Sequence, residues 1–164
     1  IFSTGMLHNT YWIESFDLDT LDAGEGKEYI QGNAINRYNG MIDVLDETVR
    51  RLRSQNIEVA VMLTASPLTY DARYGDVWAN AGSIIRQEWV ETPTVLEVRL
   101  REWTEANELP YFDTTPLFRE WMRNQPEPAP QTFYPLDGHW TSDGHILVGK
   151  WLVVWIEESG LLDD

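Results

Sequence analysis

The chain has 164 residues, 43% of them hydrophobic, so it can fold around a core of its own, and we expect one domain spanning residues 1–164. Its formal net charge of −15, from 27 acidic and 12 basic residues, argues against nucleic acid or an anionic membrane surface as a partner, because both require a basic surface. No apolar run approaches the roughly 20 residues of a membrane-spanning segment. Because the chain has no cysteine, disulfides, thiolate metal sites and cysteine catalysis are excluded.

The first segment predicts a strand followed by a long loop. Residues 1–6 are β-prone and break at Gly5, so His8 and Asn9 would lie just past the carboxyl end of that strand. The chain begins with Ile rather than Met, and we therefore expect further sequence upstream. Residues 11–31 are irregular and acidic, which predicts a long excursion such as a rim loop.

A helical pattern follows. Asp46 and Arg50 are spaced four residues apart with the acid first. Glu47 and Arg51 repeat that spacing, and such pairs stabilise a helix by a few tenths of a kcal/mol each. We expect Asn56 to end the helix. Apolar residues at helical spacing form its buried stripe: Met41, Ile42, Leu45, Val49 and Leu52.

The middle of the chain predicts a strand, a loop and a helix. Residues 57–64 are mostly apolar without strict alternation, which is typical of a strand buried on both faces in a parallel sheet. Residues 68–91 form a second polar and aromatic excursion, with weak helical character over 79–89. Thr94 and Glu97 have the spacing of a capping box, which predicts the start of a helix.

The last third predicts a strand and two helices. Residues 109–113 favour a short strand with Pro110 at its start, where a missing N–H does least harm. Thr115-Pro116 would begin a short helix, and residues 124–131 form a proline-rich loop. A final helix, capped by Thr141 or Ser142, would end at Gly160. Its inward residues are expected to be Ile146, Leu147, Gly149, Leu152, Val153 and Ile156.

The alternation of strands and helices predicts an α/β fold: a three-layer α/β/α sandwich with a parallel, flavodoxin-like sheet. Parallel strands joined by right-handed crossovers place their carboxyl ends at one edge, where ligands bind. Three positions each follow a predicted strand and would lie at that edge: His8-Asn9, Ser66 and Asp113-Thr114. Three strands make a thin sheet, so we expect missing N-terminal strands or a protein partner to complete it.

Asp137 precedes His139 by two residues, on a turn-rich loop that leads into the last helix. An Asp that orients a His, which then takes a proton from a nucleophile, is the base half of a hydrolytic triad. The structural alternative is an Asp that caps a turn and a His packed beside Trp140. No serine of the chain lies in a Gly-x-Ser-x-Gly or Gly-Asp-Ser turn. Ser66 is the nearest internal candidate, although a serine before a proline more simply ends a strand.

The block Asp137-Gly138-His139-Trp140-Thr141-Ser142-Asp143-Gly144-His145 resembles the last block of the SGNH, or GDSL-type, hydrolase and acyltransferase superfamily. It looks like the Asp-x-His-Trp branch, which includes polysaccharide O-acetylation proteins. The resemblance covers most of the chain, as the C-terminal portion of that fold without its N-terminal strands. It implies that His139 is the general base, that Asp137 orients it, and that Asn9 donates to the oxyanion. The Gly-Asp-Ser block has no match, so the resemblance implies a nucleophilic serine upstream of Ile1.

The resemblance implies a serine esterase or O-acyltransferase that acts on small acyl esters, with acetylated carbohydrate as the expected substrate. It implies no cofactor, and it favours an extracytoplasmic location. The alternative is a non-catalytic SGNH-like module that serves as a binding or structural subunit. We expect no metal, because the two histidines of the block lack zinc-site spacing. We expect His145 to pack against neighbouring side chains or to support the residues of the site. Four aromatic side chains would line a carbohydrate cleft or pack in the core: Trp12, Tyr70, Trp78 and Trp89.

Overall fold

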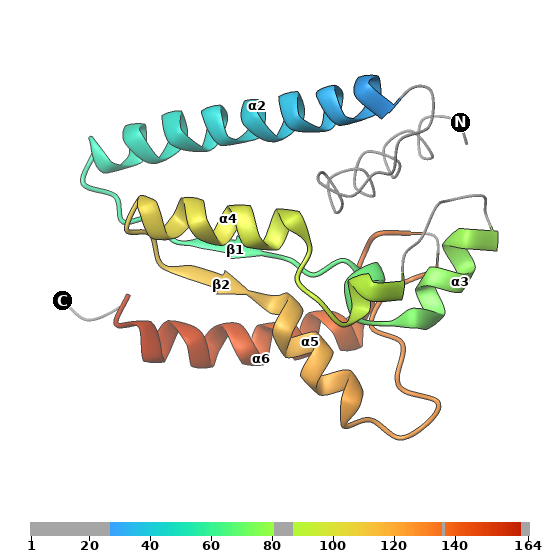
Figure 1. Ribbon diagram of the computed structural model, residues 1–164. Coiled ribbons are helices and arrows are strands. Elements are labelled where there is room, and N and C mark those ends of the chain that lie inside the picture. The colour runs from blue at the N-terminus through green and yellow to red at the C-terminus, as the bar shows by residue number, and fades with distance from the viewer. Residues whose placement is uncertain (1–26, 81–86, 136, 162–164) are drawn as a thin grey trace. The chain divides into compact units, whose positions relative to one another are not determined.

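A computed structural model describes residues 27–80, 87–135 and 137–161 (Figure 1). The predicted strand at residues 1–6, and His8 and Asn9 after it, lie outside the described residues. The chain divides into two compact units, one made of Ile1–Ala60 and Thr94–Leu109, the other of Val61–Pro93 and Pro110–Asp164. The single domain expected from the sequence stays a prediction.

The first unit contains the helices α2 (Lys27–Arg53) and α4 (Val95–Ala106). We expected a loop over residues 11–31, and the end of that prediction is wrong, because α2 already begins at Lys27. The indole Nε1 of Trp103 on α4 donates to Asp46 Oδ1 on α2 at 2.8 Å. The Arg53 guanidinium donates to the carbonyl oxygen of Asn107 at 2.8 Å, so the end of α2 is tied to the end of α4.

One of the two expected ion pairs on α2 forms. Glu47 binds Arg51, as predicted, and it also binds Arg50 three residues away. The two guanidinium groups, Arg50 first, lower the pKa of the Glu47 carboxyl. The expected pair between Asp46 and Arg50 is wrong, because Asp46 accepts the indole hydrogen bond from α4 and Arg50 turns to Glu47.

The predicted capping box at the start of α4 is confirmed. The Thr94 hydroxyl accepts from the Glu97 N–H at 3.3 Å, and the Glu97 carboxylate accepts from the Thr94 N–H at 2.7 Å. These two bonds satisfy N–H groups that the first turn of a helix leaves without partners, and a cap of this kind contributes about 1 kcal/mol.

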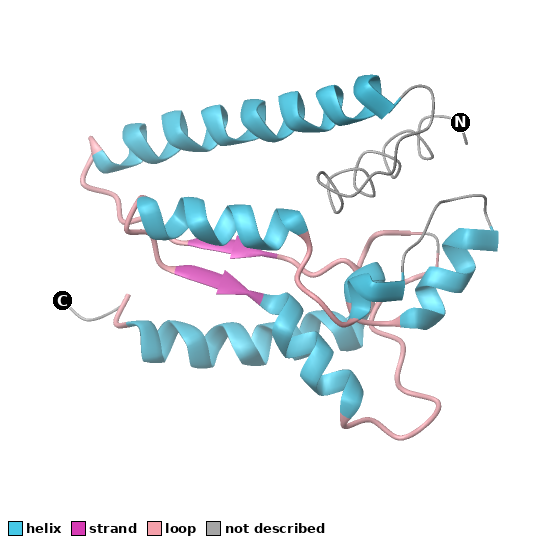
Figure 2. Ribbon diagram, in the orientation of Figure 1, coloured by secondary structure: helices cyan, strands magenta, loops and turns pink. Residues whose placement is uncertain are grey.

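The second unit contains two parallel strands, β1 (Val61–Leu63) and β2 (Tyr111–Asp113), with Val61 opposite Tyr111. Figure 2 shows the two strands running in the same direction. The expected strand at residues 57–64 is shorter in the structure, and the Val61 N–H donates to the Pro110 carbonyl at 2.8 Å. The protein is therefore mixed α/β, mostly helical, with a parallel sheet. The three-layer sandwich stays a prediction.

The segment between the strands is more helical than the sequence indicated. It contains two 3-10 helices, η1 (Pro67–Thr69) and η2 (Gln87–Val90), and the helix α3 (Ala72–Asn80). We expected an irregular segment over residues 68–91, and this prediction is wrong for residues 72–80, which form α3. The helix begins before the weak helical stretch expected at 79–89. The overlooked signal is an apolar stripe at helical spacing, made by Tyr74, Val77 and Trp78.

Two further helices follow β2, namely α5 (Thr114–Arg123) and α6 (Ser142–Ser159). The Asp113 carboxylate caps α5 by accepting from the Thr115 N–H at 2.8 Å. The helix thus starts one residue earlier than expected from Thr115-Pro116. For α6 the expected cap is confirmed, because Thr141 accepts from the Gly144 N–H at 3.2 Å. Gly160 ends α6 with a φ of 69°, a conformation that favours glycine.

The core of the second unit is aromatic. Phe118 is completely buried and stacks on Tyr70, with ring centroids 4.5 Å apart. Trp151 on α6 and Phe118 form a T-shaped pair with ring centroids 5.0 Å apart, and Trp155 stacks on Phe112 of β2 at a centroid distance of 5.2 Å. These rings identify the inward face of α6.

That face differs from the expected one. Ile146 and Val153, both expected inward, are each 56% exposed, and Gly149 is exposed as well. Val148 is buried instead, on the same face as Trp151. Because α6 is apolar around most of its circumference, hydrophobicity alone did not select the correct face.

Arg119 on α5 joins the irregular segments of the second unit. Its guanidinium is buried and donates to three backbone carbonyl oxygens, those of Thr69 at 2.8 Å, Trp89 at 3.0 Å and Thr92 at 2.7 Å. Carbonyls of irregular backbone have no regular partner, so one planar group with five donors holds η1 and η2 to α5.

Gly144 lies where the start of α6 meets the backbone of Thr132. A Cβ added there would collide with the Thr132 carbonyl oxygen and lie 3.1 Å from the Trp140 Cβ. We expect Gly144→Ala to lower the free energy of unfolding by about 1–3 kcal/mol. Gly149→Ala is the matched control, since nothing lies within 4 Å of its added Cβ, and it should raise stability by about 0.5–1 kcal/mol. Urea denaturation measures both, and equal stability of the two variants would contradict this close approach.

Candidate active site

The loop that carries Asp137 and His139 starts and ends on paired backbone. Phe133 and Trp140 form an antiparallel β-bridge at its base. Inside the bridge, the Tyr134 N–H donates to the His139 carbonyl oxygen at 3.1 Å, and the Asp137 N–H donates to the Tyr134 carbonyl oxygen at 3.2 Å. The loop is therefore a tight hairpin whose ends cannot separate without breaking this pairing.

The hairpin brings the two predicted site residues together. Asp137 Oδ1 lies in direct contact with His139 Nδ1, and it also accepts from the His139 backbone N–H at 3.2 Å. A carboxylate at Nδ1 favours the tautomer with the proton on that nitrogen, which leaves Nε2 as the basic atom. Among the described residues, Nε2 has no hydrogen-bond partner.

The pair is open to solvent. The side chain of His139 is 85% exposed and that of Asp137 is 52% exposed. Water therefore screens the attraction between the two groups, so their contact adds little to the stability of the fold. The arrangement supplies an oriented, accessible base rather than a closed cavity.

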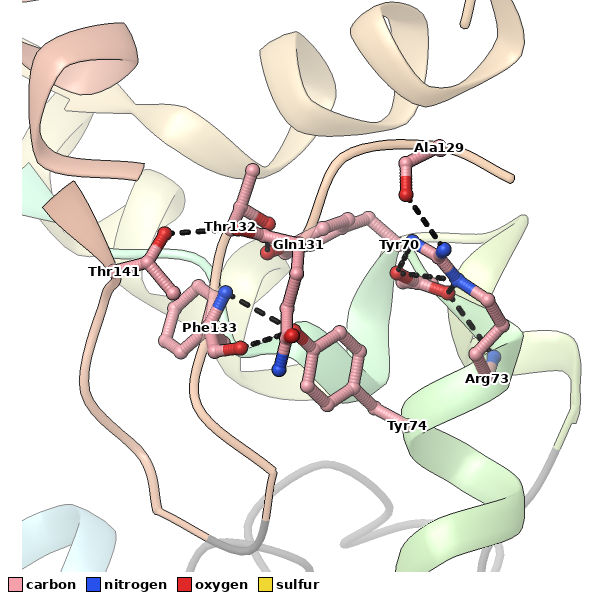
Figure 3. Close-up of polar contacts among 9 residues, drawn as sticks. Tyr70, Arg73, Tyr74, Ala129, Gln131, Thr132, Phe133 and Thr141 are labelled. Carbon is pink, nitrogen blue, oxygen red and sulfur yellow. Dashed lines mark hydrogen bonds and ion pairs between the residues drawn. The ribbon is translucent and has the colours of Figure 1, made fainter. Parts of the chain in front are cut away.

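Two buried tyrosines hold the backbone on which the hairpin stands (Figure 3). The Tyr74 hydroxyl donates to the Phe133 carbonyl oxygen and accepts from the Phe133 N–H at 3.0 Å. The Tyr70 hydroxyl pairs with the Thr132 hydroxyl at 2.7 Å. Tyr70 directly follows η1 and Tyr74 lies on α3, so the base of the hairpin rests on the helical segment that follows β1.

Thr141 fixes the other end of the loop to the same backbone. Its N–H donates to the Thr132 carbonyl oxygen at 2.9 Å, and its hydroxyl donates to the Gln131 carbonyl oxygen at 2.8 Å (Figure 3). The same hydroxyl caps α6 by accepting from Gly144. One side chain thus links the hairpin, the segment at residues 131–133 and the last helix.

The other residues expected at the sheet edge have structural roles. Ser66 caps η1 by accepting from the Leu68 N–H at 3.4 Å, and Asp113 caps α5. The Thr114 hydroxyl accepts from the Ala65 N–H at 2.7 Å and donates to the Leu63 carbonyl oxygen at 3.1 Å. The third candidate site residue, Asn9, lies outside the described residues.

No described serine hydrogen-bonds to His139. Ser54 and Ser159 donate to backbone carbonyls of their own segments, and Ser66 is a cap. The ring of His145 meets Trp140 edge-on at 5.3 Å, which is the packing role expected for it.

Three of the four aromatic residues considered as a carbohydrate surface lie in the core instead. Tyr70, Trp78 and Trp89 are buried, and Trp12 lies outside the described residues. In the part of the chain that the structure describes, no three acidic or histidine side chains gather as a metal site would require. The helices of that part do not combine the length and apolar character needed to cross a bilayer.

Sequence reasoning missed the residues that hold and flank the hairpin. Tyr70, Arg73 and Tyr74 precede it by about 60 residues and lie in a stretch expected to be a loop. Tyr74 binds the backbone of Phe133 and Arg73 that of Ala129, whereas Tyr70 binds the Thr132 hydroxyl. Contacts between segments so far apart in the sequence are not predicted by local patterns. The helical stripe of α3 was a local signal for Tyr74 alone.

Burial raises the pKa of the Tyr70 hydroxyl well above its usual value near 10, and it raises that of Tyr74 as well. A folded-state pKa above the unfolded value contributes stability that is complete below about pH 10 and is lost as the pH rises beyond it. Tyr70→Phe should cost about 1 kcal/mol at pH 7, through the lost bond to Thr132. Above pH 10, its stability should fall less steeply than that of the wild type, by up to about 1.4 kcal/mol per pH unit.

Urea denaturation between pH 8 and 12 measures this difference. Tyr134→Phe is the matched control, because it removes the same hydroxyl from a half-exposed side chain. Parallel curves for wild type and Tyr70→Phe would show that Tyr70 does not stay protonated in the folded protein.

Comparison of the chain with models of protein families, with curated protein sequences and with solved structures gave no match. The assignment of a function therefore depends on the residues of the hairpin and on their geometry.

Proposed function

We propose that Asp137 and His139 form the base half of a Ser-His-Asp triad in a serine esterase or O-acyltransferase that acts on small acyl esters of carbohydrate. The observation that carries the proposal is the contact between Asp137 Oδ1 and His139 Nδ1 on a hairpin held at both ends. The proposal includes a three-layer SGNH-like fold whose remaining strands and serine lie outside the described residues.

In this mechanism, His139 Nε2 takes the proton of the serine hydroxyl as its oxygen attacks the ester carbonyl carbon. The carbonyl π electrons move onto oxygen, and return as the C–O bond to the alcohol breaks. The imidazolium gives its proton to the departing alcohol, which leaves an acyl-serine. Water or a sugar hydroxyl then repeats the sequence, giving hydrolysis or transfer. Asp137 stabilises the imidazolium formed in both halves.

The tetrahedral intermediate carries a negative oxygen that needs hydrogen-bond donors. Asn9 is the proposed side-chain donor, together with backbone N–H groups. Removing one such donor typically costs about 10²–10³ in rate. Asp137 is the carboxylate in contact with the imidazole, so it is the group that stabilises the positive charge of the imidazolium.

Rigid support of the hairpin also favours a catalytic role. A general base acts only when its nitrogen lies within hydrogen-bond reach of the proton it removes, and small misplacements lower the rate. The hydroxyls of Tyr70, Tyr74 and Thr141 fix the backbone on both sides of the loop. These contacts hold the loop in one position, as a general base requires.

The exposure of His139 favours a second candidate, a non-catalytic SGNH-like module that binds a partner or a saccharide. A ring that is 85% exposed, with no described serine bonded to it, is also what a protein would show if the catalytic set were incomplete. The two candidates differ in ester hydrolysis by the full-length protein, including any residues that precede Ile1. No turnover by that protein would favour the module.

His139→Ala should abolish hydrolysis of p-nitrophenyl acetate by the full-length protein, lowering kcat by at least about 10³, because no other base replaces Nε2. His145→Ala is the matched control, since it removes an imidazole six residues away and should leave kcat nearly unchanged. Circular dichroism should show the same fold for both variants. Unchanged turnover in His139→Ala would contradict the assignment of His139 as the general base of a triad.

Asp137→Asn tests the orienting role separately. The amide keeps the shape of the carboxylate but favours the wrong imidazole tautomer, so kcat should fall by up to about 10⁴ with KM little changed. Asp143→Asn removes the same charge from an exposed carboxylate in the first turn of α6, and its kcat should match that of the wild type. Equal effects of the two substitutions would mean that net charge, rather than orientation of His139, matters.

A further inference from the structure

The helix α6 carries an apolar surface that faces away from the core. It is one uninterrupted helix of 18 residues (Figure 1). Of the large apolar side chains exposed in the described part of the chain, three lie on α6 and are at least half exposed: Ile146, Val153 and Val154. At 100° per residue, Ile146 and Val153 fall opposite Trp151 and Trp155, whose rings pack in the core. A helix that is apolar on two sides is normally covered on both, so this outer side is a docking surface.

Two opposite charges lie along one edge of this surface. Lys150 and Glu157 are exposed and lie about two turns apart, on the same side of Ile146 and Val153. The positions three and four residues away from each charge are apolar or glycine, so the helix itself offers neither of them an ion pair. Among the described residues, neither side chain has a hydrogen-bond or ion-pair partner. Both charges are therefore available to a second molecule.

The spacing of the two charges makes the surface complementary to itself. If a two-fold axis crosses α6 between Val153 and Val154, Lys150 and Glu157 lie roughly 5 Å to either side of it along the helix. The rotation then places Lys150 of one copy beside Glu157 of the other, and the reverse, so both ion pairs form together. Val153 lies next to the axis and meets its own copy. Charges this close to the crossing point stay in reach at the usual angles between packed helices.

We propose that the outer side of α6, formed by Ile146, Lys150, Val153, Val154 and Glu157, binds a second copy of this chain in an antiparallel pair with two-fold symmetry. A second copy matches the apolar centre and both charges with the same surface, which is the arrangement of a self-complementary interface. A parallel pair would instead set Lys150 against its own copy. This pairing uses no residue of the hairpin, so it goes beyond the proposed function and does not depend on it.

The size and the charge of the surface set the strength of the pair. One helix packed against one helix buries less than the roughly 1,200 Å² of a standard interface, so the dimer is weak and depends on concentration. Each copy also carries a formal charge of −15, which opposes association. Salt at about 0.15 M screens this repulsion beyond about 8 Å, whereas ion pairs at an interface are screened much less. We therefore expect a Kd on the order of 100 μM at that salt concentration.

Sedimentation equilibrium of the full-length protein, including any residues that precede Ile1, measures the association. The protein is studied from about 10 μM to about 1 mM in about 0.15 M NaCl, a range that brackets the expected Kd. The expected result is a reversible equilibrium between monomer and dimer. A mass that stays monomeric over the whole range overturns the proposal. That outcome also follows if another segment of the full-length protein covers α6.

A matched pair of substitutions locates the interface on α6. Val153→Asp places a carboxylate next to the two-fold axis, facing its own copy, and should weaken the dimer by at least about tenfold. Val44→Asp makes the same change at a valine of α2 that is 65% exposed, and it should leave Kd unchanged. Circular dichroism checks that both variants fold. Equal Kd values for Val153→Asp and Val44→Asp overturn the assignment of the interface to α6.

Charge reversal tests the antiparallel pairing and does not depend on Val153→Asp. Lys150→Glu and Glu157→Lys each turn both attractive pairs into repulsive ones, so each variant alone should dimerise about tenfold more weakly. An equimolar mixture of the two should recover the wild-type Kd, because opposite charges face each other again in the mixed pair. Arg101→Glu on α4 changes the net charge as Lys150→Glu does, and its Kd should stay within about twofold of the wild type. An unchanged Kd for Lys150→Glu, or no gain on mixing, overturns the antiparallel pair.

Discussion

The backbone of Thr132 and Phe133 is the constraint on which the candidate site depends. Both residues are buried, so each of their peptide groups needs a partner inside the protein. One phenol, that of Tyr74, serves both the N–H and the carbonyl of Phe133, while Thr141 serves the carbonyl of Thr132. A buried polar group left without a partner costs about 1–3 kcal/mol, so this backbone has one favourable position. The hairpin starts and ends at this backbone, so the position of Asp137 and His139 is fixed by it.

The same principle explains how a unit with only two described three-residue strands can be ordered. A short sheet pairs few backbone groups, and the remainder need side chains. Thr114 bonds both the Ala65 N–H and the Leu63 carbonyl just beyond β1, and Arg119 takes three carbonyls from irregular backbone. The aromatic core around Phe118 fixes the elements from which these side chains extend. Polar side chains here replace the hydrogen bonds that longer strands would make.

The sequence predicted what depends on neighbours in the chain. The capping box at Thr94 and the cap of α6 by Thr141 were correct, because each follows from a few consecutive residues. The parallel pairing of two apolar segments was also correct, and it followed from the apolar run at residues 57–64 and the order of strands and helices. Predictions failed where a distant group decided the outcome. Asp46 bonds to Trp103 rather than to Arg50, and the aromatic core selects the inward face of α6. The Asp137–His139 contact needs only two residues and a turn, whereas its support by Tyr70 and Tyr74 depends on tertiary packing. The role of Asn9 as an oxyanion donor stays a prediction.

The Asp71–Arg73 pair supports the backbone that leads into the hairpin. Arg73 uses one side of its guanidinium to bind the buried Asp71 carboxylate, and its Nη1 donates to the Ala129 carbonyl, four residues before Phe133. Asp71 is 2% exposed, so its charge needs a partner inside the protein. Loss of Arg73 would leave that charge and the Ala129 carbonyl uncompensated together. The same side chain therefore compensates a buried charge on the segment after β1 and holds the chain where it enters the loop.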